Sequence, residues 1–382
     1  MELIPGEKSV TLKWQVENLK DFTGFNLYRS VDTDDSFSLY KTFSADEREY
    51  IDTDVEQSRW YFYRMTLLGQ SLESMPSNIT KVLLGPGTIW LLSRYGYSIQ
   101  QYAYDLIYLK NLFNTTYPPT TWAMNPSEGE IWLVYPPYRA VSRFDLNLGY
   151  ENIFITDSLR YPIDAVLGFN NERLLVLDQT MSRIYVYWEN LFLGKINLPG
   201  DGYFRLLFIP NQTIAAMSNY DIRLYNSDGD SLNHIRFAED GQGKDMIFTR
   251  GMIYILIAND TQKSSQIITY NVTQHTIERI TLDGIFNLVR KEPDSSYFWV
   301  TEVLNENNHR LVKLSIDGNR LLELSMVNQI YDFDINPIDH SLVTIEKYGN
   351  ELYSRKVALY DKEGNLLSST TNVWDAIKVA IQ

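Results

Sequence analysis

The sequence has no cysteine among its 382 residues, which excludes disulfides, thiolate metal sites and cysteine nucleophiles. It also has no apolar run near the roughly 20 residues that a membrane helix requires, so we expect no membrane span. Positive charge is scarce, with 34 Lys and Arg against 48 Asp and Glu and a net charge of −14. Because a nucleic-acid partner requires a basic stripe against its phosphates, we expect no nucleic-acid binding.

Aromatic residues, by contrast, are abundant, with 27 Tyr, 17 Phe and 8 Trp. Such side chains favour the half-buried surface of a β-sheet. Near the start of the chain Val10, Leu12 and Trp14 alternate with polar residues, which predicts a strand with one buried face. Further strands of this kind, at 25–29 and 61–66, are separated by turn residues, as in a β-sandwich.

Residues 1–84 resemble a fibronectin type III domain. The segments that carry the resemblance are Leu12–Trp14, Gly24–Arg29, Tyr50–Asp52, Tyr61–Met65 and Glu73–Asn78. The resemblance implies that Trp14 is the core tryptophan and that Tyr61 is the corner tyrosine, whose hydroxyl bonds to backbone upstream. Domains of this family are mostly spacers or docking modules.

Residues 85–382 repeat with a period of roughly 42 residues, which predicts a β-propeller. One mark of the repeat is a Gly-containing hairpin, present at 224–232, 314–321 and 359–366. A second mark is an apolar run that predicts the second strand of each repeat. The seven runs are Ile89–Leu92, Ile131–Val134, Leu174–Leu177, Ile214–Met217, Ile253–Leu256, Phe298–Val300 and Leu342–Ile345.

The innermost strand of the first repeat is missing from the start of this region and is found at the end of the chain, in Val373–Ile381. We expect it to pair with Ile89–Leu92, which closes the ring and removes exposed sheet edges. The predicted fold is therefore all-β, with a small fibronectin-type sandwich followed by a seven-bladed propeller closed by the C-terminal strand.

The hairpins of the second region are similar to NHL and YVTN-type repeats. These families are mostly binding scaffolds, and a minority are lyases or hydrolases with metal or histidine sites in the central channel. No enzymatic motif of theirs is present here. The four histidines (His234, His275, His309 and His340) are expected on outer hairpins and loops at the surface, and no Gly-x-Ser-x-Gly elbow occurs.

Alignment of the innermost strands predicts a ring of residues around the central channel. Its members are Trp122, Asp164, Arg205, Asp245, Asn287, Asp332 and Asp375. The carboxylates could hold a cation such as Ca²⁺, or the ring could bind a sugar or peptide with Trp122 as a stacking face. The alternative is structural, because polar side chains at strand starts also satisfy backbone N–H groups and fix blade spacing.

Loops between the second and third strands are expected on the same face as the open end of the ring. They carry side chains typical of interface hot spots, although some tyrosines fall in loops by chance. The candidate binding residues there are Arg94, Tyr95, Tyr97, Tyr135, Tyr138, Arg139 and Tyr348.

These observations predict a non-enzymatic binding or scaffold protein with a protein or carbohydrate partner and no required cofactor. By analogy with adhesion modules we expect export to the periplasm or cell surface, although the sequence shows no signal peptide. One alternative is a propeller lyase or hydrolase that uses a divalent cation at the acidic ring. Another is a structural subunit of a surface assembly.

Overall fold

The computed structural model describes residues 1–382 except 17–21, 126–127, 325–327 and 382. Apart from one short 3-10 helix, η2 (Pro136–Tyr138), the regular elements of the described residues are β-strands. This confirms the predicted all-β class. Among the described residues, no helix has the length and apolarity needed to cross a membrane.

Strands β1–β7 form two antiparallel sheets, with orders β1-β2-β5 and β4-β3-β6-β7. The strands are β1 (Glu2–Pro5), β2 (Val10–Lys13), β3 (Gly24–Val31), β4 (Ser38–Ser44), β5 (Glu49–Asp52), β6 (Trp60–Leu68) and β7 (Thr80–Leu83). Trp14 is buried between Phe25 and Phe43, with ring centroids 5.8 and 5.0 Å away. The Tyr61 hydroxyl accepts a hydrogen bond from the Glu56 backbone N–H at 2.7 Å, so the predicted upstream contact is present.

From Thr88 to Ile381 the described residues form seven four-stranded antiparallel sheets. The first sheet contains β8 (Thr88–Ser93), β9 (Ser98–Ala103), β10 (Leu109–Asn114) and β35 (Ala376–Ile381). The next three contain β11 (Thr121–Asn125), β12 (Glu130–Tyr135), β13 (Ala140–Asp145), β14 (Tyr150–Ile155), β15 (Pro162–Gly168), β16 (Arg173–Asp178), β17 (Arg183–Trp188), β18 (Leu191–Asn197), β19 (Tyr203–Ile209), β20 (Thr213–Ser218), β21 (Asp221–Tyr225) and β22 (Ser231–Arg236). The last three contain β23 (Gln242–Thr249), β24 (Met252–Asn259), β25 (Ser264–Asn271), β26 (Ile277–Asp283), β27 (Phe286–Lys291), β28 (Tyr297–Asn305), β29 (Asn308–Ser315), β30 (Arg320–Leu324), β31 (Ile330–Ile335), β32 (Leu342–Lys347), β33 (Ser354–Tyr360) and β34 (Leu366–Trp374).

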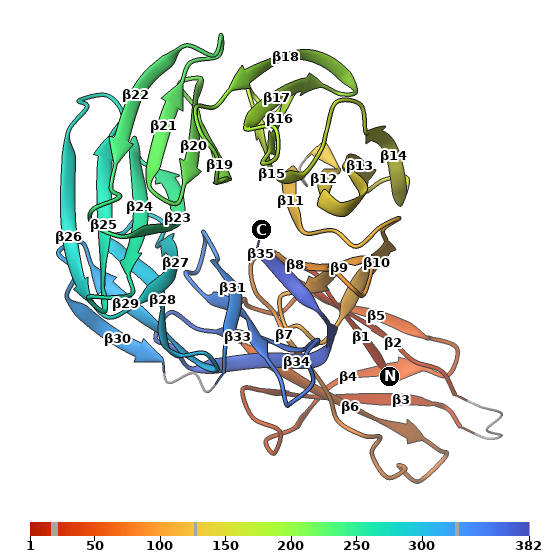
Figure 1. The fold of residues 1–382 in the computed structure, drawn as a ribbon. Coiled ribbons are helices and arrows are strands. Elements are labelled where there is room, and N and C mark those ends of the chain that lie inside the picture. Colours follow the sequence, from red (N-terminus) through yellow and green to blue (C-terminus); the bar gives the residue numbers. More distant parts are fainter. Residues whose placement is uncertain (17–21, 126–127, 325–327, 382) are drawn as a thin grey trace.

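The sheets are arranged in a ring as in a β-propeller, with one strand of each facing the centre (Figure 1). These inner strands are β11, β15, β19, β23, β27, β31 and β35, and successive members contact one another. The predicted apolar runs all lie in the second strands, which are buried because each is covered by neighbouring sheets. In β20, for example, all six residues are buried.

The C-terminal strand closes the ring by pairing with β8, in a register that places Ile381 opposite Ile89 and Lys378 opposite Leu92. This confirms the predicted pairing, with one correction. Val373 and Trp374 end β34 instead of beginning the closing strand. Only Asp375 separates the two strands, and its φ of 45° turns the chain from the outside of the last sheet to the centre.

The predicted hairpins join the third and fourth strands of their sheets. In the first of them the Gly229 N–H donates to the Asn226 carbonyl at 3.1 Å, and Gly229 has a φ of 87°. A positive φ of this size explains why glycine stands there.

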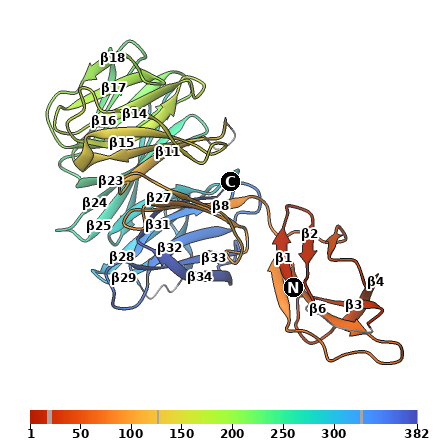
Figure 2. The ribbon, with the colours of Figure 1, turned by 90° about the vertical axis from the view of Figure 1, so that its right-hand side faces the viewer.

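Strands β1–β7 lie to one side of the ring (Figure 2). Trp60 and Leu83 pack against the hydrophobic core that the closing sheet shares with β32 and β33. Just beyond, the Asn336 side-chain amide donates to the Pro86 carbonyl at 2.9 Å. The N-terminal sheets are therefore attached next to the point where the ring closes.

Candidate functional site

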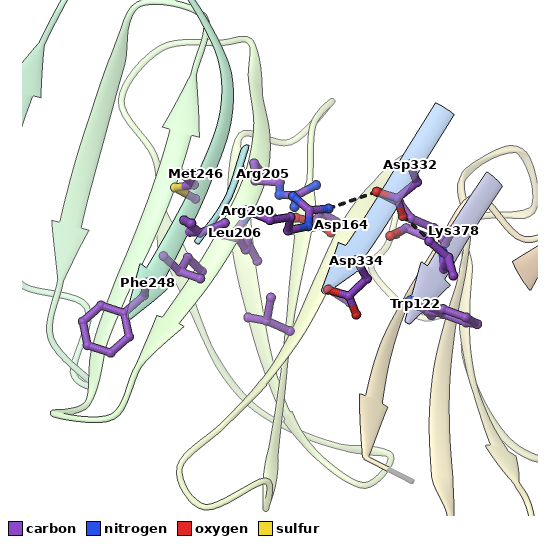
Figure 3. Close-up of a pocket in the computed structure, with 16 residues that line it drawn as sticks. Trp122, Asp164, Arg205, Leu206, Met246, Phe248, Arg290, Asp332, Asp334 and Lys378 are labelled. Carbon is purple, nitrogen blue, oxygen red and sulfur yellow. Dashed lines mark hydrogen bonds and ion pairs between the residues drawn. The ribbon is translucent and has the colours of Figure 1, made fainter. Parts of the chain in front are cut away.

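The centre of the ring contains a cavity of about 380 Å³ that is lined by residues from all seven inner strands (Figure 3). Four members of the predicted ring line it, namely Trp122, Asp164, Arg205 and Asp332. Asp245 is buried beside the cavity, where its carboxylate bonds to Arg290.

Two members of the predicted ring are placed differently. Asn287 lies on β27 at an irregularity in the strand pairing, between Phe286, which is opposite Glu302, and Leu288, which is opposite Thr301. Its Oδ1 accepts a hydrogen bond from the Thr301 hydroxyl. Asp375 lies outside the channel, between β34 and β35, because these strands join without the loop that separates the other sheets. The residue of β35 that lines the cavity is Lys378.

The register of Lys378 corresponds to that of the aspartates. Lys378 follows an irregularity in the pairing of β35 with β8, just as Asp164 and Asp332 follow irregularities in β15 and β31. Arg290 and Asp334 also line the cavity and were missed by the alignment. Asp334 lies two residues beyond Asp332, and Arg290 lies two residues beyond Leu288, which follows the irregularity in β27, whereas the alignment had used Asn287. The alternation of side chains along β31 was the signal that could have found Asp334.

The carboxylates of the ring connect neighbouring sheets. Asp164 Oδ2 accepts a hydrogen bond from the Leu206 backbone N–H on the next inner strand, at 2.7 Å. Asp245 and Asp332 accept equivalent bonds at 3.2 and 3.1 Å. The donors of those two bonds are the backbone N–H groups of Val289 and Val379. These bonds are the structural role that the sequence left open as an alternative.

A buried ion-pair network adds to these contacts. Arg290 donates to Asp332 Oδ1 at 2.9 Å (Figure 3) and to Asp245 Oδ2 at 2.8 Å. It therefore links β27 with the inner strands on both sides. Arg205 Nη2 lies 3.1 Å from Asp245 Oδ1. Burial alone would raise the pKa of Asp245, but Arg205 and Arg290 outweigh it and hold that pKa below its ordinary value.

Two other carboxyl groups of the cavity are less well compensated. Burial raises the pKa of Asp164, although Arg205 and the Leu206 N–H oppose the rise. Burial also raises the pKa of Asp334 to about 6, and Arg290 opposes this effect. The cavity wall carries groups of both charge signs together with Trp122.

This arrangement does not favour a divalent cation. The oxygens of Asp164, Asp245 and Asp332 already bond to backbone N–H groups or to Arg290, and Lys378 and Arg205 add positive charge to the wall. Within the described ranges, no group of three or more His, Asp or Glu is placed to hold a metal ion.

The candidate loops lie at the end of the ring where the inner strands begin, since Ala376 pairs with Ser93 and Thr121 pairs with Val134. Tyr135 is not part of this surface. It is fully buried at the end of β12, where its hydroxyl donates to Glu151 Oε2 at 2.9 Å. The apolar run Ile131–Val134 that precedes Tyr135 did not indicate that a polar hydroxyl would also be buried there.

The remaining loop residues are at least partly exposed, and several are held by neighbours. Tyr138 stacks on Tyr117 at 4.1 Å between ring centroids. Tyr95 packs edge-on against Tyr353 at 4.8 Å, and Arg94 lies over the Tyr95 ring at 4.6 Å. The other exposed members of the set are Tyr97, Arg139 and Tyr348.

The histidines do not converge on one place. His234 is on β22, His275 and His340 are in loops, and His309 is on β29. His309 is buried, which corrects the expectation that it lies at the surface. Its Nδ1 accepts a hydrogen bond from the Ile330 N–H at 3.2 Å, and burial lowers its pKa.

Neither the protein-family models nor the curated proteins include a match to this sequence. Solved structures do match. A protein from Lactobacillus plantarum is 13% identical with a TM-score of 0.61 over 78% of this chain and 99% of its own. Kuenenia stuttgartiensis hydrazine synthase is 12% identical with a TM-score of 0.55 over 64% of this chain and 77% of its own. The computationally designed Ika8 protein is 10% identical with a TM-score of 0.54 over 73% of this chain and 82% of its own. At these identities the similarity concerns the fold alone, and it agrees with the sheet arrangement of a β-propeller.

Proposed function

We propose that this chain is a binding protein whose propeller recognises a protein or glycan partner. The observation that carries the proposal is the set of exposed aromatic side chains fixed on one end of the ring, of which Tyr95 and Tyr138 are held by ring contacts. Pre-positioned aromatic groups lose little conformational entropy on binding and bury a large area. The central cavity supplies polar groups of both signs.

The channel chemistry supports binding over catalysis. The carboxylates that a hydrolase or lyase would need as bases or metal ligands hold neighbouring sheets together through Leu206, Val289 and Val379. A group that fixes the scaffold in this way cannot change partners during a reaction without loosening the ring. A rigid ring is instead suited to present a fixed surface.

The proposal extends to the architecture. We take the seven four-stranded sheets of the described residues to be seven blades, formed by residues 85–382, and residues 1–84 to be a fibronectin type III-like sandwich that serves as a spacer. The buried Trp14 and the Tyr61 contact support the second assignment. Separate expression of the two regions tests this division, since each should unfold cooperatively by itself.

We further propose that the protein is exported to the periplasm or the cell surface, because it combines a fibronectin type III-like domain with a propeller that serves in binding. Fractionation of source cells tests this part, and recovery of the full-length protein from the cytosol alone would remove it.

The binding function is tested with the full chain immobilised and offered to arrays of glycans and of extracellular proteins. The Tyr95→Ala and Tyr138→Ala variants should weaken a specific interaction about tenfold or more, because truncation of a hot-spot aromatic commonly costs more than 1.4 kcal/mol, about tenfold in Kd. Trp188→Ala is the matched control, since Trp188 is an exposed aromatic at the end of β17, in another sheet. Equal loss in all three variants, or no specific partner on either array, would contradict the proposal.

A further inference from the structure

A second cleft, of about 320 Å³, lies where the ring closes, between the closing sheet and the sheet β31–β34. Its wall is formed on one side by β8, β9 and β10 and on the other by β33 and β34. The volume is at the lower end of the range for small-ligand sites. Unlike the central cavity, it has no charged residue in its lining.

The polar groups of this cleft are hydroxyls and carboxamides. They belong to Ser93, Ser98, Gln100, Asn114, Ser354 and Thr371. Hydroxyl and amide groups both donate and accept hydrogen bonds, so they match a ligand that is rich in hydroxyls. A charged ligand would lose its hydration there without meeting a counter-charge.

One polar atom of the cleft has no partner in the described protein. Gln100 Oε1 is buried and accepts no hydrogen bond, whereas Nε2 of the same side chain donates to the Ser98 hydroxyl at 3.4 Å. A buried acceptor without a donor is unfavourable, so rotation of the Gln100 carboxamide into the cleft would let a ligand hydroxyl satisfy this oxygen.

The apolar part of the wall is formed by Leu112, Val373 and Trp374, and the aromatic member, Trp374, is 46% exposed. Tyr353 holds its ring from the side at 5.8 Å between centroids, and Tyr95 packs on Tyr353 in turn. A flat aromatic face next to hydroxyl and amide groups suits the C–H face of a sugar ring.

The closure of the ring fixes the shape of the cleft. The Ser93 hydroxyl donates to the Trp374 carbonyl, which joins the first and last sheets. Gly96 leaves room for this contact, because a Cβ at that position would lie 2.2 Å from Ser93 Oγ. The nearest carboxylate along the chain, Asp375, is engaged by Arg355 at 2.8 Å and Arg94 at 3.0 Å, so it brings no free charge to the cleft.

We propose that this cleft is a binding site for a neutral saccharide, with Trp374 stacking on a sugar ring and Gln100 bonding to its hydroxyls. This inference rests on the proposed recognition function and specifies a ligand class for it. Because the lining is uncharged, saccharides that carry a carboxylate, such as uronic acids or sialic acid, should bind more weakly than their neutral counterparts.

The test is calorimetric titration of the full chain with neutral oligosaccharides of glucose, galactose, mannose and N-acetylglucosamine, alongside uronic-acid and sialylated comparators. At least one neutral compound should bind, and Trp374→Ala and Gln100→Leu should each raise its Kd by about tenfold or more. Trp188→Ala and Trp122→Ala should leave that Kd unchanged. The melting temperature of each variant shows that it is folded.

Two results would overturn the inference and are distinguishable from failure of the proposed function. Saccharide binding that is lost in Trp122→Ala and kept in Trp374→Ala would place the ligand in the central cavity, and the binding function would stand. No binding of any neutral saccharide would remove the cleft as a sugar site, while a protein partner sensitive to Tyr95→Ala would still support recognition.

Discussion

Arg355 and Asp375 form an ion pair, 2.8 Å from Nη2 to Oδ1, in which both side chains are almost completely buried. Asp375 stands at the turn between β34 and β35, and the Arg94 guanidinium binds the second oxygen of its carboxylate at 3.0 Å. The pair therefore fixes the point at which the chain enters the closing strand. Asp375 thus stabilises the closure of the ring although its side chain lies outside the channel.

We expect Arg355→Met to destabilise the protein by about 3–5 kcal/mol, because it leaves a buried carboxylate without its main partner. Urea unfolding measures this loss. Arg250→Met is the control, since Arg250 pairs with the highly exposed Asp294 and its loss should cost less than about 1 kcal/mol. Equal stability of the two variants would show that the Arg355 pair does not secure the closure.

The bond between Asp164 and the Leu206 N–H should contribute measurably to the contact between neighbouring sheets. Asp164→Ala leaves this backbone N–H without its acceptor, and we expect a loss of about 1–3 kcal/mol in the free energy of unfolding. Asp164→Asn keeps an acceptor oxygen and should lose less. If Ala and Asn cost the same, the hydrogen bond is not the source of the effect.

Calcium should not stabilise the protein, because the ring carboxylates are bonded to backbone N–H groups and to Arg290. We expect equal melting temperatures in Ca²⁺, in Mg²⁺ and in EDTA. A ligand at a hundredfold excess over its Kd would add about 2.7 kcal/mol, which is easily detected. A Ca²⁺-dependent rise abolished by Asp332→Ala would restore the acidic ring as a cation site.

Stability should depend on pH through Asp334. Burial raises the pKa of this carboxyl in the folded state to about 6, above the ordinary value of 3.8, so folding favours its protonated form. The contribution of the protonated Asp334 carboxyl to the free energy of unfolding is complete below pH 3.8 and is lost as the pH rises through about 6. Asp334→Asn keeps an acceptor for the Ile381 N–H and carries no charge.

The variant should therefore match the wild type near pH 4 and exceed its stability by about 1–3 kcal/mol at pH 8, since one pKa unit corresponds to about 1.4 kcal/mol. Denaturant unfolding at a series of pH values measures the difference. A stability difference that does not change with pH would refute the role of Asp334, whatever its sign.

The repetition of apolar runs and Gly-containing turns was enough to predict the strands and their order. Each run, such as Leu174–Leu177, is buried on both faces. It is therefore apolar at consecutive positions and can be recognised from the sequence alone. The pairing of the last strand with Ile89–Leu92 followed from the same count, because a ring with one strand missing at its start must take it from elsewhere.

The side chains that meet in the channel were decided by the tertiary structure. Irregular pairing near the start of every inner strand except β11 shifts the register by one residue. The direct passage from β34 to β35 moves Asp375 out of the channel and brings Lys378 in. The cleft beside Trp374 likewise depends on contact between the two ends of the ring, at Ser93 and Trp374. Sequence periodicity reports which face of a strand is buried, whereas contacts between distant residues depend on how the sheets close around one another.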